Sequence, residues 1–232
     1  MKDENGKVVI EGYYDGIKID EYTHNILKNV PDNIESIHNM LAINSPETVG
    51  SHYQESLQFP SLNVRGISSG WVGEKARTIV PDKAIAEIDI RLVPEIEGEK
   101  LIKLVKNHIS NQGYYIIDKE PTIEERMKYS KIALIKVGSV TNPFRTELDN
   151  KYGIWISSIL KSTFNEEVVQ IRIMGGTVPI APFINELQIP AFILPMVNPD
   201  NNQHSPNENL KIGLIAYGIK TFYNLLSSPL SK

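Results

Sequence analysis

A strand pattern followed directly by an amphipathic helix constrains most strongly what this chain can fold into. Over residues 83–92, apolar side chains alternate with a mostly polar set, which is the period-two pattern of a strand with one buried face. Residues 97–112 then place apolar side chains three and four positions apart, and Gly113 stands where a helix C-cap glycine belongs. With further strands expected at residues 114–117 and 131–137, this part of the chain predicts a small α+β sandwich on an antiparallel sheet.

The stretch before this pattern is polar and mostly helical in character. Between residues 20 and 58, apolar side chains recur at spacings of three and four until Asn44, Ser45 and Pro46 interrupt them. We interpret this stretch as a surface arm.

Residues 140–232 predict an α/β unit instead. The elements expected are a helix with Thr146 and Asp149 as its capping box, a strand at residues 168–173, a short helix at 182–187 and an apolar strand at 191–197. Because the last strand has no polar face, we expect it to be buried on both sides, as in a parallel or mixed sheet covered by helices.

The closing helix has a clear start signal, and a histidine directly precedes it. Ser205 is expected as N-cap, Pro206 at the first helical position and Glu208 two positions later, with the helix running to about Ser227. His204 would then lie at the end of the preceding buried strand, where open α/β sheets bind ligands. This position supports a functional role for His204 and a histidine that only hydrogen-bonds its own loop about equally.

Composition limits the classes of function. The chain has 232 residues, 41% of them hydrophobic, which is enough for a real core in one large or two small domains. A net charge of −4 without basic blocks argues against nucleic acid as a partner, and no apolar run is long enough to cross a membrane. The absence of cysteine excludes disulfides, thiolate metal ligands and a cysteine nucleophile. A cytoplasmic protein is the simplest expectation.

Two further places could bind an anion. Residues 175–177 join a strand to a helix, and their N–H groups and hydroxyl could hold a carboxylate or phosphate, although glycine pairs usually only permit a turn with positive φ. Arg91 shares a strand face with Glu87 and Asp89. A charge ladder is the plainer interpretation of that face, and a planar fork for an anionic substrate is the functional one.

Other hydrolase patterns are weak or missing. Residues 66–70 match Gly-x-Ser-x-Gly, but no helical pattern opens directly afterwards, so we interpret the match as a chance one in a glycine-rich turn. Neither His-x-Asp nor HExxH occurs, and the Glu-Glu pairs at 124–125 and 166–167 fall in polar turns that predict solvated surface. Spacing alone therefore does not assemble a complete active site.

Four sequence blocks carry a family resemblance. In chain order, PSLNVRG, ARTIVPDKAIAEIDIRLVPE, GGTVP and HSPNE resemble the carnosinase-like branch of the zinc aminoacylase, acetylornithine deacetylase and carboxypeptidase family. The second block, with a threonine thirteen positions before Arg91, is the most specific. GGTVP is similar to the family's Gly-Gly-Ser-Ile-Pro with threonine in place of serine, and HSPNE is similar to its C-terminal metal-ligand motif. The resemblance covers Pro60 onward, and the arm before it resembles the dipeptidase branch's insertion.

The resemblance implies a two-domain plan. Family members combine a catalytic domain that holds two metal ions with an inserted lid of ferredoxin-like α+β fold that dimerises. Residues 1–139 would be a partial lid with its N-terminal arm, and residues 140–232 would be the C-terminal half of an α/β zinc-exopeptidase catalytic domain. His-x-Asp, the bridging aspartate and the Glu-Glu that contains the general base would then lie outside these 232 residues.

The resemblance also assigns one metal ligand and a set of substrate-binding residues, but no catalytic residue. His204 would bind one Zn²⁺, with the neighbouring polar loop setting its tautomer. Four residues would hold the substrate's C-terminal carboxylate: Arg91, Gly175, Gly176 and Thr177. Thr78 would reach into the partner subunit's site. Ile173-Met174 stand where the carnosinase branch carries Arg-Glu, which leaves the substrate's details open.

The function expected from the resemblance is that of a metal-dependent dipeptidase or amidohydrolase. It would cleave the amide bond of a small peptide or N-acyl amino acid with a free carboxylate, using two divalent metal ions, zinc with manganese or cobalt as alternatives. The metal site in this chain would be incomplete and the chain alone inactive. The partner would be a second copy bound through the lid, and exposed sheet edge would promote association. Two alternatives remain, an acetylornithine deacetylase-like deacylase and a non-catalytic dimerisation or binding module.

Overall fold

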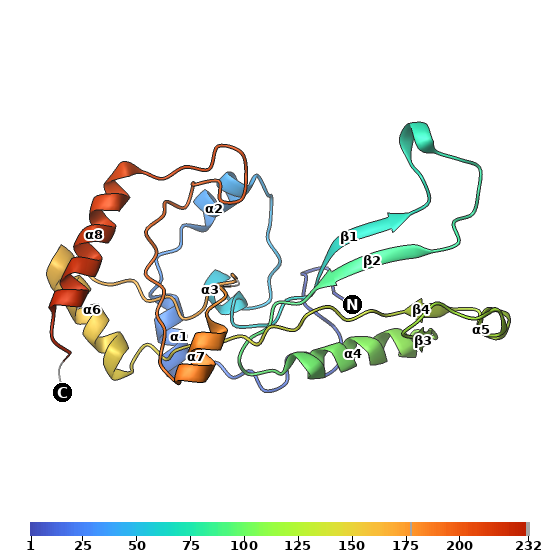
Figure 1. Ribbon diagram of the computed structural model, residues 1–232, viewed down its shortest axis with the longest axis horizontal. Coiled ribbons are helices and arrows are strands. Elements are labelled where there is room, and N and C mark those ends of the chain that lie inside the picture. The colour runs from blue at the N-terminus through green and yellow to red at the C-terminus, as the bar shows by residue number, and fades with distance from the viewer. Residues whose placement is uncertain (177, 231–232) are drawn as a thin grey trace. The chain divides into compact units, whose positions relative to one another are not determined.

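The computed structural model describes residues 1–176 and 178–230, which form two compact units (Figure 1). Unit 1 comprises residues 1–18 and 47–144, and unit 2 comprises residues 19–46 and the chain from residue 145 onward. The stretch predicted as one surface arm is therefore divided between the two units. The family domain boundary expected between residues 139 and 140 stays a prediction; by packing, the chain passes from unit 1 to unit 2 after residue 144.

Unit 1 contains two small separate sheets and one long helix. Its elements are α3 (Tyr53–Ser56), β1 (Asn63–Ser69), the 3₁₀ turn η1 (Gly73–Lys75), β2 (Ala84–Asp89), α4 (Gly98–Asn111), β3 (Tyr115–Ile117), α5 (Ile123–Lys128) and β4 (Ile132–Leu134). The expected strands are present, but the expectation of one antiparallel sheet is wrong. β1 and β2 pair antiparallel, whereas β3 and β4 form a second, parallel pair. The short helix α5 between β3 and β4 returns the chain to the same end, which makes that pair parallel.

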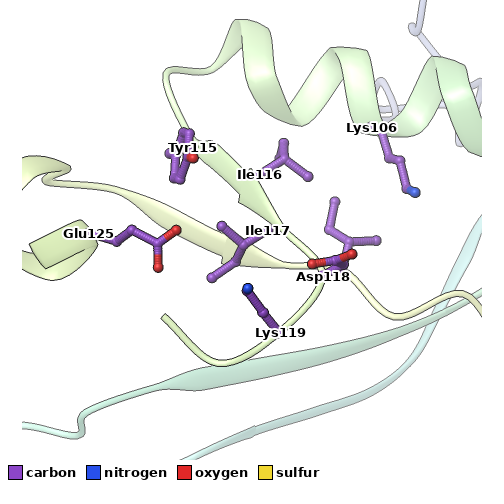
Figure 2. A pocket seen from close by; sticks show the side chains of 8 residues that line it. Lys106, Tyr115, Ile116, Ile117, Asp118, Lys119 and Glu125 are labelled. Carbon is purple, nitrogen blue, oxygen red and sulfur yellow. The ribbon is translucent and has the colours of Figure 1, made fainter. Parts of the chain in front are cut away.

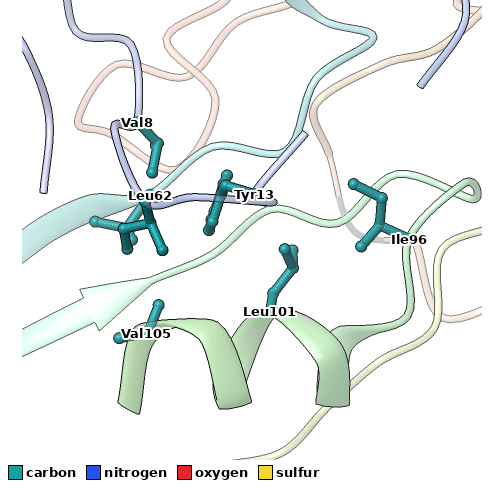
Figure 3. Packing of buried hydrophobic residues seen from close by; sticks show 7 residues of the cluster. Val8, Tyr13, Leu62, Ile96, Leu101 and Val105 are labelled. Atoms are coloured by element: carbon teal, nitrogen blue, oxygen red, sulfur yellow. The ribbon is translucent and has the colours of Figure 1, made fainter. Parts of the chain in front are cut away.

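Helix α4 forms where the periodicity predicts it, and its apolar face closes the core of unit 1. Leu101 and Val105, one helical turn apart, are buried against Tyr13 and Leu62 (Figure 3). The buried Tyr13 hydroxyl donates to the Ser61 carbonyl at 3.0 Å, so its polar atom is satisfied inside the core. Gly113 has a φ of +87°, which confirms the expected C-cap glycine.

Unit 2 contains helices but no strand among its described residues. Its elements are α1 (Glu21–Lys28), α2 (Ile34–Leu41), α6 (Lys151–Phe164), α7 (Ala181–Leu187) and α8 (Ile212–Ser227). Helices α6 and α8 pack side by side, with the rings of Phe164 and Tyr217 stacked 4.6 Å apart (Figure 1). None of the helices in the described part of the chain is long and apolar enough to cross a membrane.

Three local expectations for unit 2 are wrong. Helix α6 is capped by Asn150, whose Oδ1 accepts from the N–H groups of Tyr152 and Gly153, and the Thr146 hydroxyl accepts from the Ala191 N–H instead of capping a helix. Residues 168–173 and 191–197 form neither helix nor strand in the described structure. Since a strand is defined by its partner, an apolar sequence without a neighbouring strand among the described residues does not become one.

The closing helix begins later than its start signal predicts. α8 starts at Ile212, after Lys211, and not after Ser205. The reason lies in the intervening loop, where His204 and Asn207 have φ values of +63° and +64° and therefore cannot belong to a right-handed helix. Asparagine tolerates this left-handed conformation better than most residues, and its side chain competes for backbone hydrogen bonds.

Candidate metal and carboxylate site

His204 lies on the loop between residues 191–197 and helix α8. Its side chain is exposed, and its backbone is left-handed. The fold therefore leaves the imidazole accessible to an ion, which is what a metal ligand requires. Its assignment as a ligand, and the setting of its tautomer by the loop, stay predictions.

A network of asparagines holds this loop. Asn198 is 3% exposed, and its carboxamide nitrogen donates to Asp200 Oδ1 at 2.8 Å and to Asn209 Oδ1 at 3.0 Å, while its oxygen accepts from the Lys211 N–H at 3.0 Å. Asn201, also buried, accepts at its backbone oxygen from the Asn209 N–H at 2.9 Å. The loop is thus closed by two layers of hydrogen bonds.

The carboxylate of Asp200 is committed to this network. The hydrogen bonds from Asn198 and then from Lys211 lower the pKa of Asp200 below its ordinary value of 3.8, since they favour the charged form. Lys211 Nζ lies 3.2 Å from the same carboxylate. Asp200 is therefore ionised at neutral pH and is engaged by its own loop.

The Gly175-Gly176 pair is exposed and does not need glycine for its local conformation. Neither residue has positive φ, and a Cβ built on either would meet no atom of the described residues within 4 Å. The expectation of a turn with positive φ is therefore wrong. The open space leaves the backbone N–H groups approachable by a ligand. Thr177, the third member of the predicted set, lies outside the described residues.

Arg91 lies just beyond the end of β2 and binds a neighbouring acid. Its Nε donates to Asp89 Oδ2 at 2.8 Å, and its side chain is 53% exposed. Glu87, expected on the same face, pairs instead with Arg65 at 3.1 Å. The charge-ladder interpretation thus holds for these acids, and a guanidinium oriented by Asp89 remains accessible for an anion.

Thr78 lies on the loop that joins β1 to β2. A hydrogen bond from the Ile79 N–H to the Arg77 carbonyl, 2.9 Å long, makes a tight turn with the exposed Thr78 at its centre. Arg77 lies over the Trp71 ring at 5.6 Å from its centre. The loop therefore presents Thr78 outward, while its assigned contact with a partner subunit stays a prediction.

Ser68 is not a nucleophile at an elbow. It lies within β1, paired with Ile85 of β2, and a short 3₁₀ turn rather than an α-helix follows. The interpretation of residues 66–70 as a chance match is therefore confirmed.

A hollow in the described surface of unit 1 lies away from the predicted site residues. It has a volume of about 330 Å³ and is lined by β3 and its neighbours, with Lys106, Asp118, Lys119 and Glu125 on its walls (Figure 2). Two cationic and two anionic side chains give it no preference for an anionic substrate. None of the predicted site residues lines it, so it does not replace the predicted site.

The residues assigned to one site are divided between the units. Arg91 and Thr78 belong to unit 1, and Gly175, Gly176 and His204 belong to unit 2. His204 fits a zinc ion as one ligand, because it is an exposed imidazole, but catalytic zinc normally has about three protein ligands. The remainder of the donor set at its loop is amide-rich, and the loop's carboxylate Asp200 is already bound.

Comparison with known proteins places these features in a family. Residues 18–115 match the family model described as the peptidase dimerisation domain. The crystal structure of the M20 family metallo-carboxypeptidase Sso-CP2 from Sulfolobus solfataricus is 25% identical and superposes with a TM-score of 0.74 over 97% of this chain and 49% of that one. Residues 18–115 thus resemble a peptidase dimerisation domain, and the chain as a whole is similar to M20 family metallopeptidases. Its α/β fold and its dimerisation domain are those of this family.

Two curated relatives of this chain are named as dipeptidases. The Cys-Gly metallodipeptidase DUG1 of Candida albicans is 26% identical over 95% of the chain, and the Beta-Ala-His dipeptidase of Mus musculus is 26% identical over 96%. In both cases the chain spans 44% of the relative's length. The predicted membership of a hydrolase family is thereby confirmed.

Sequence reasoning missed the residues that hold the His204 loop. Asn198, Asn201 and Asn209 were part of a polar loop with no assigned role. The signal was the density of asparagine and aspartate in the segment NPDNNQHSPNEN, because these side chains cap turns and tolerate left-handed backbone. That signal predicts an ordered loop, but not which asparagine is buried.

Proposed function

We propose that this chain supplies one metal ligand, the carboxylate-binding groups and the dimerising element of a metal-dependent dipeptidase. The observation that carries the proposal is the exposed His204 on a hydrogen-bonded loop, within a chain similar to metallodipeptidases over 95% of its length. The substrate class follows from Arg91, because a guanidinium fixed in orientation recognises a carboxylate with parallel hydrogen bonds.

The chain's own residues account for binding rather than bond cleavage. A divalent metal ion polarises the scissile carbonyl and activates a water when it is bound. His204 would hold that ion through its imidazole. Arg91 and the open Gly175-Gly176 backbone bind the carboxylate of a small peptide and so fix which amide is presented.

Turnover requires ligands beyond this set. We expect the purified 232-residue chain with added Zn²⁺ to hydrolyse neither dipeptides nor N-acyl amino acids, because one imidazole does not hold a catalytic metal pair. Measurable hydrolysis by the chain, with or without added Zn²⁺, would contradict this. The coding sequence immediately upstream of Met1 is the decisive observation, since a frame there with His-x-Asp and Glu-Glu would supply the other ligands and the general base.

The choice between dipeptidase and deacylase can be tested on the protein that such a frame encodes. A panel would compare dipeptides, the same dipeptides with an amidated C-terminus, and N-acetyl amino acids. We expect turnover of the free dipeptides and loss of most of it on amidation, because Arg91 then lacks its anion. Preferential turnover of the acetylated amino acids would favour the deacylase.

The dimer in this proposal forms through the β1–β2 hairpin. The hairpin lies within the matched dimerisation domain and leaves large apolar side chains in water, with Ile67 78%, Val72 84% and Val80 93% exposed. Such a surface favours association with a second copy. Sedimentation should show a dimer that Ile67→Lys and Val72→Lys weaken, whereas Ile123→Lys, at an equally exposed position on α5, should leave it intact. A monomer at all concentrations would contradict the dimer.

A further inference from the structure

The side-chain amide of Asn198 makes hydrogen bonds to residues at both ends of the His204 loop. Asn198 stands at the beginning of the loop, and Lys211 is the last residue before α8. An amide offers two N–H donors and an accepting oxygen, and in Asn198 the nitrogen makes two bonds and the oxygen one. A polar group as buried as this one destabilises the fold unless it is hydrogen-bonded, so each of these bonds is needed.

These bonds connect the beginning of the loop to its end. Asp200 follows Asn198 closely, whereas Asn209 and Lys211 lie on the far side of His204. One side chain therefore fixes the distance between the two stems from which His204 is presented. Inside this closure, the Asn209 N–H donates to the Asn201 carbonyl and the Ser205 N–H to the Asn202 carbonyl, both at 2.9 Å.

The backbone of His204 needs this support. A φ of +63° is unfavourable for a residue with a side chain, and such a conformation persists only where the surrounding structure determines it. Two other loop residues, Asn202 and Asn207, are also left-handed. If the closure opened, the three left-handed residues would relax, and the imidazole would no longer leave the loop in one direction.

We propose that Asn198 is a positioning residue for His204, whose buried carboxamide closes the loop and so presents the imidazole to a divalent cation in one orientation. This inference rests on the proposed function for the cation. It assigns a role to a residue that touches neither metal nor substrate. Metal ligands generally depend on such supporting hydrogen bonds for affinity.

The test exchanges an amide for an acid at constant shape. Asn198→Asp keeps the oxygen that accepts from Lys211 but places a carboxylate against Asp200 and Asn209 Oδ1. The double variant Asn198→Asp/Asp200→Asn restores one amide and one carboxylate to the pair. Asn224→Asp is the matched control, because Asn224 lies on α8 and, within the described structure, its side-chain amide donates to the Lys220 carbonyl and not to the His204 loop.

Two residue-specific NMR measurements on the 232-residue chain test the proposal: amide hydrogen exchange in the loop and Zn²⁺ binding at His204. We expect Asn198→Asp to speed amide hydrogen exchange in residues 199–211 about 10-fold or more. We also expect it to raise the apparent Kd for Zn²⁺, followed on the His204 imidazole signals, about 10-fold. The double variant should recover most of both effects, and the control should show neither. Unchanged exchange and unchanged zinc shifts in Asn198→Asp would overturn the inference.

The two proposals fail differently. If His204 signals of the unaltered chain do not respond to Zn²⁺, the metal role is wrong, and the exchange data alone then show whether Asn198 closes the loop. If Asn198→Asp unfolds unit 2, seen as loss of protected amides in α8, the double variant decides. Recovery of both fold and loop protection supports the pairing, and recovery of the fold with a fast-exchanging loop overturns it.

Discussion

Arg91 Nε donates to Asp89 Oδ2 at 2.8 Å, so the guanidinium expected to bind a substrate carboxylate is already oriented by an acid of its own segment. The bond joins the last residue of β2 to the segment that leaves the sheet. Both partners are partly exposed, with side-chain exposures of 53% for Arg91 and 33% for Asp89. The pair therefore serves orientation more than stability, since exposed ion pairs contribute little.

Replacing the acid tests that relationship. Asp89→Asn should change the free energy of unfolding by less than about 1 kcal/mol, because the pair is solvated. The Nε–H of Arg91 should exchange faster with water once its charged acceptor is gone, as followed by NMR. Glu87→Gln is the control, because it breaks the neighbouring Arg65 pair and should leave the Arg91 signal unchanged. A loss of stability well above this value would show that Asp89 is structural.

The exposed glycine pair gives a second prediction. Gly175→Ala and Gly176→Ala should leave the thermal unfolding midpoint almost unchanged, since neither position has positive φ and a Cβ meets open space among the described residues. Reduced binding of a small carboxylate such as glycylglycine by either variant, measured by NMR, would then reflect ligand approach rather than misfolding. Destabilisation by more than about 1 kcal/mol would contradict the local geometry.

Two helical glycines make a matched pair for packing. At Gly153 of α6, a Cβ would collide with the carbonyl group of Leu148, which belongs to the backbone and cannot turn away. Gly153→Ala should therefore lower the free energy of unfolding by about 1–3 kcal/mol. Gly213 of α8 faces open space, and Gly213→Ala should raise it by about 0.4–1 kcal/mol. Chemical denaturation measures both, and equal effects would contradict the packing at Leu148.

Two candidate helix caps can be compared, Asn150 at the observed start of α6 and Ser205 at the predicted start of α8. Asn150 accepts from the N–H groups of Tyr152 and Gly153 at 2.8 and 3.1 Å, so Asn150→Ala should destabilise the protein by about 1 kcal/mol. Ser205, expected from sequence to cap α8, lies in the loop and caps nothing in the described structure. Ser205→Ala should therefore cost less than about 0.5 kcal/mol. A larger loss at Ser205 would restore the sequence-based start.

Acid should loosen the His204 loop through Asp200. Because hydrogen bonds from Asn198 and Lys211 hold the pKa of Asp200 below 3.8, its carboxylate stabilises the folded loop fully above that pH. The contribution is lost as the pH falls through the lowered pKa of the folded state. NMR titration should show the Asp200 carboxyl changing below pH 3.8, with faster amide exchange in residues 199–211 over the same range. A midpoint above 3.8 would contradict the network.

Local chemistry predicts several of these features directly. The periodicity of residues 97–112 and the glycine after them locate α4 and its cap within one or two residues, because a helix is made from contacts three and four positions apart. The missing helix after residue 70 likewise excludes the serine elbow. The four family blocks suffice for the family, since they record residue types at fixed spacing.

Tertiary structure alone decides the rest. An apolar run such as 191–197 becomes a strand only beside another strand, and whether β3 and β4 run parallel depends on how the chain returns between them. The start of α8 is set by hydrogen bonds between residues as far apart as Asn198 and Lys211, which override a local cap signal at Ser205. The sequence by itself thus determined helix α4, the family resemblance and the candidate residues His204 and Arg91. Strand pairing and the closure of the His204 loop depend on long-range contacts. The groups that make these contacts are far apart in the sequence, so local spacing does not predict that they meet.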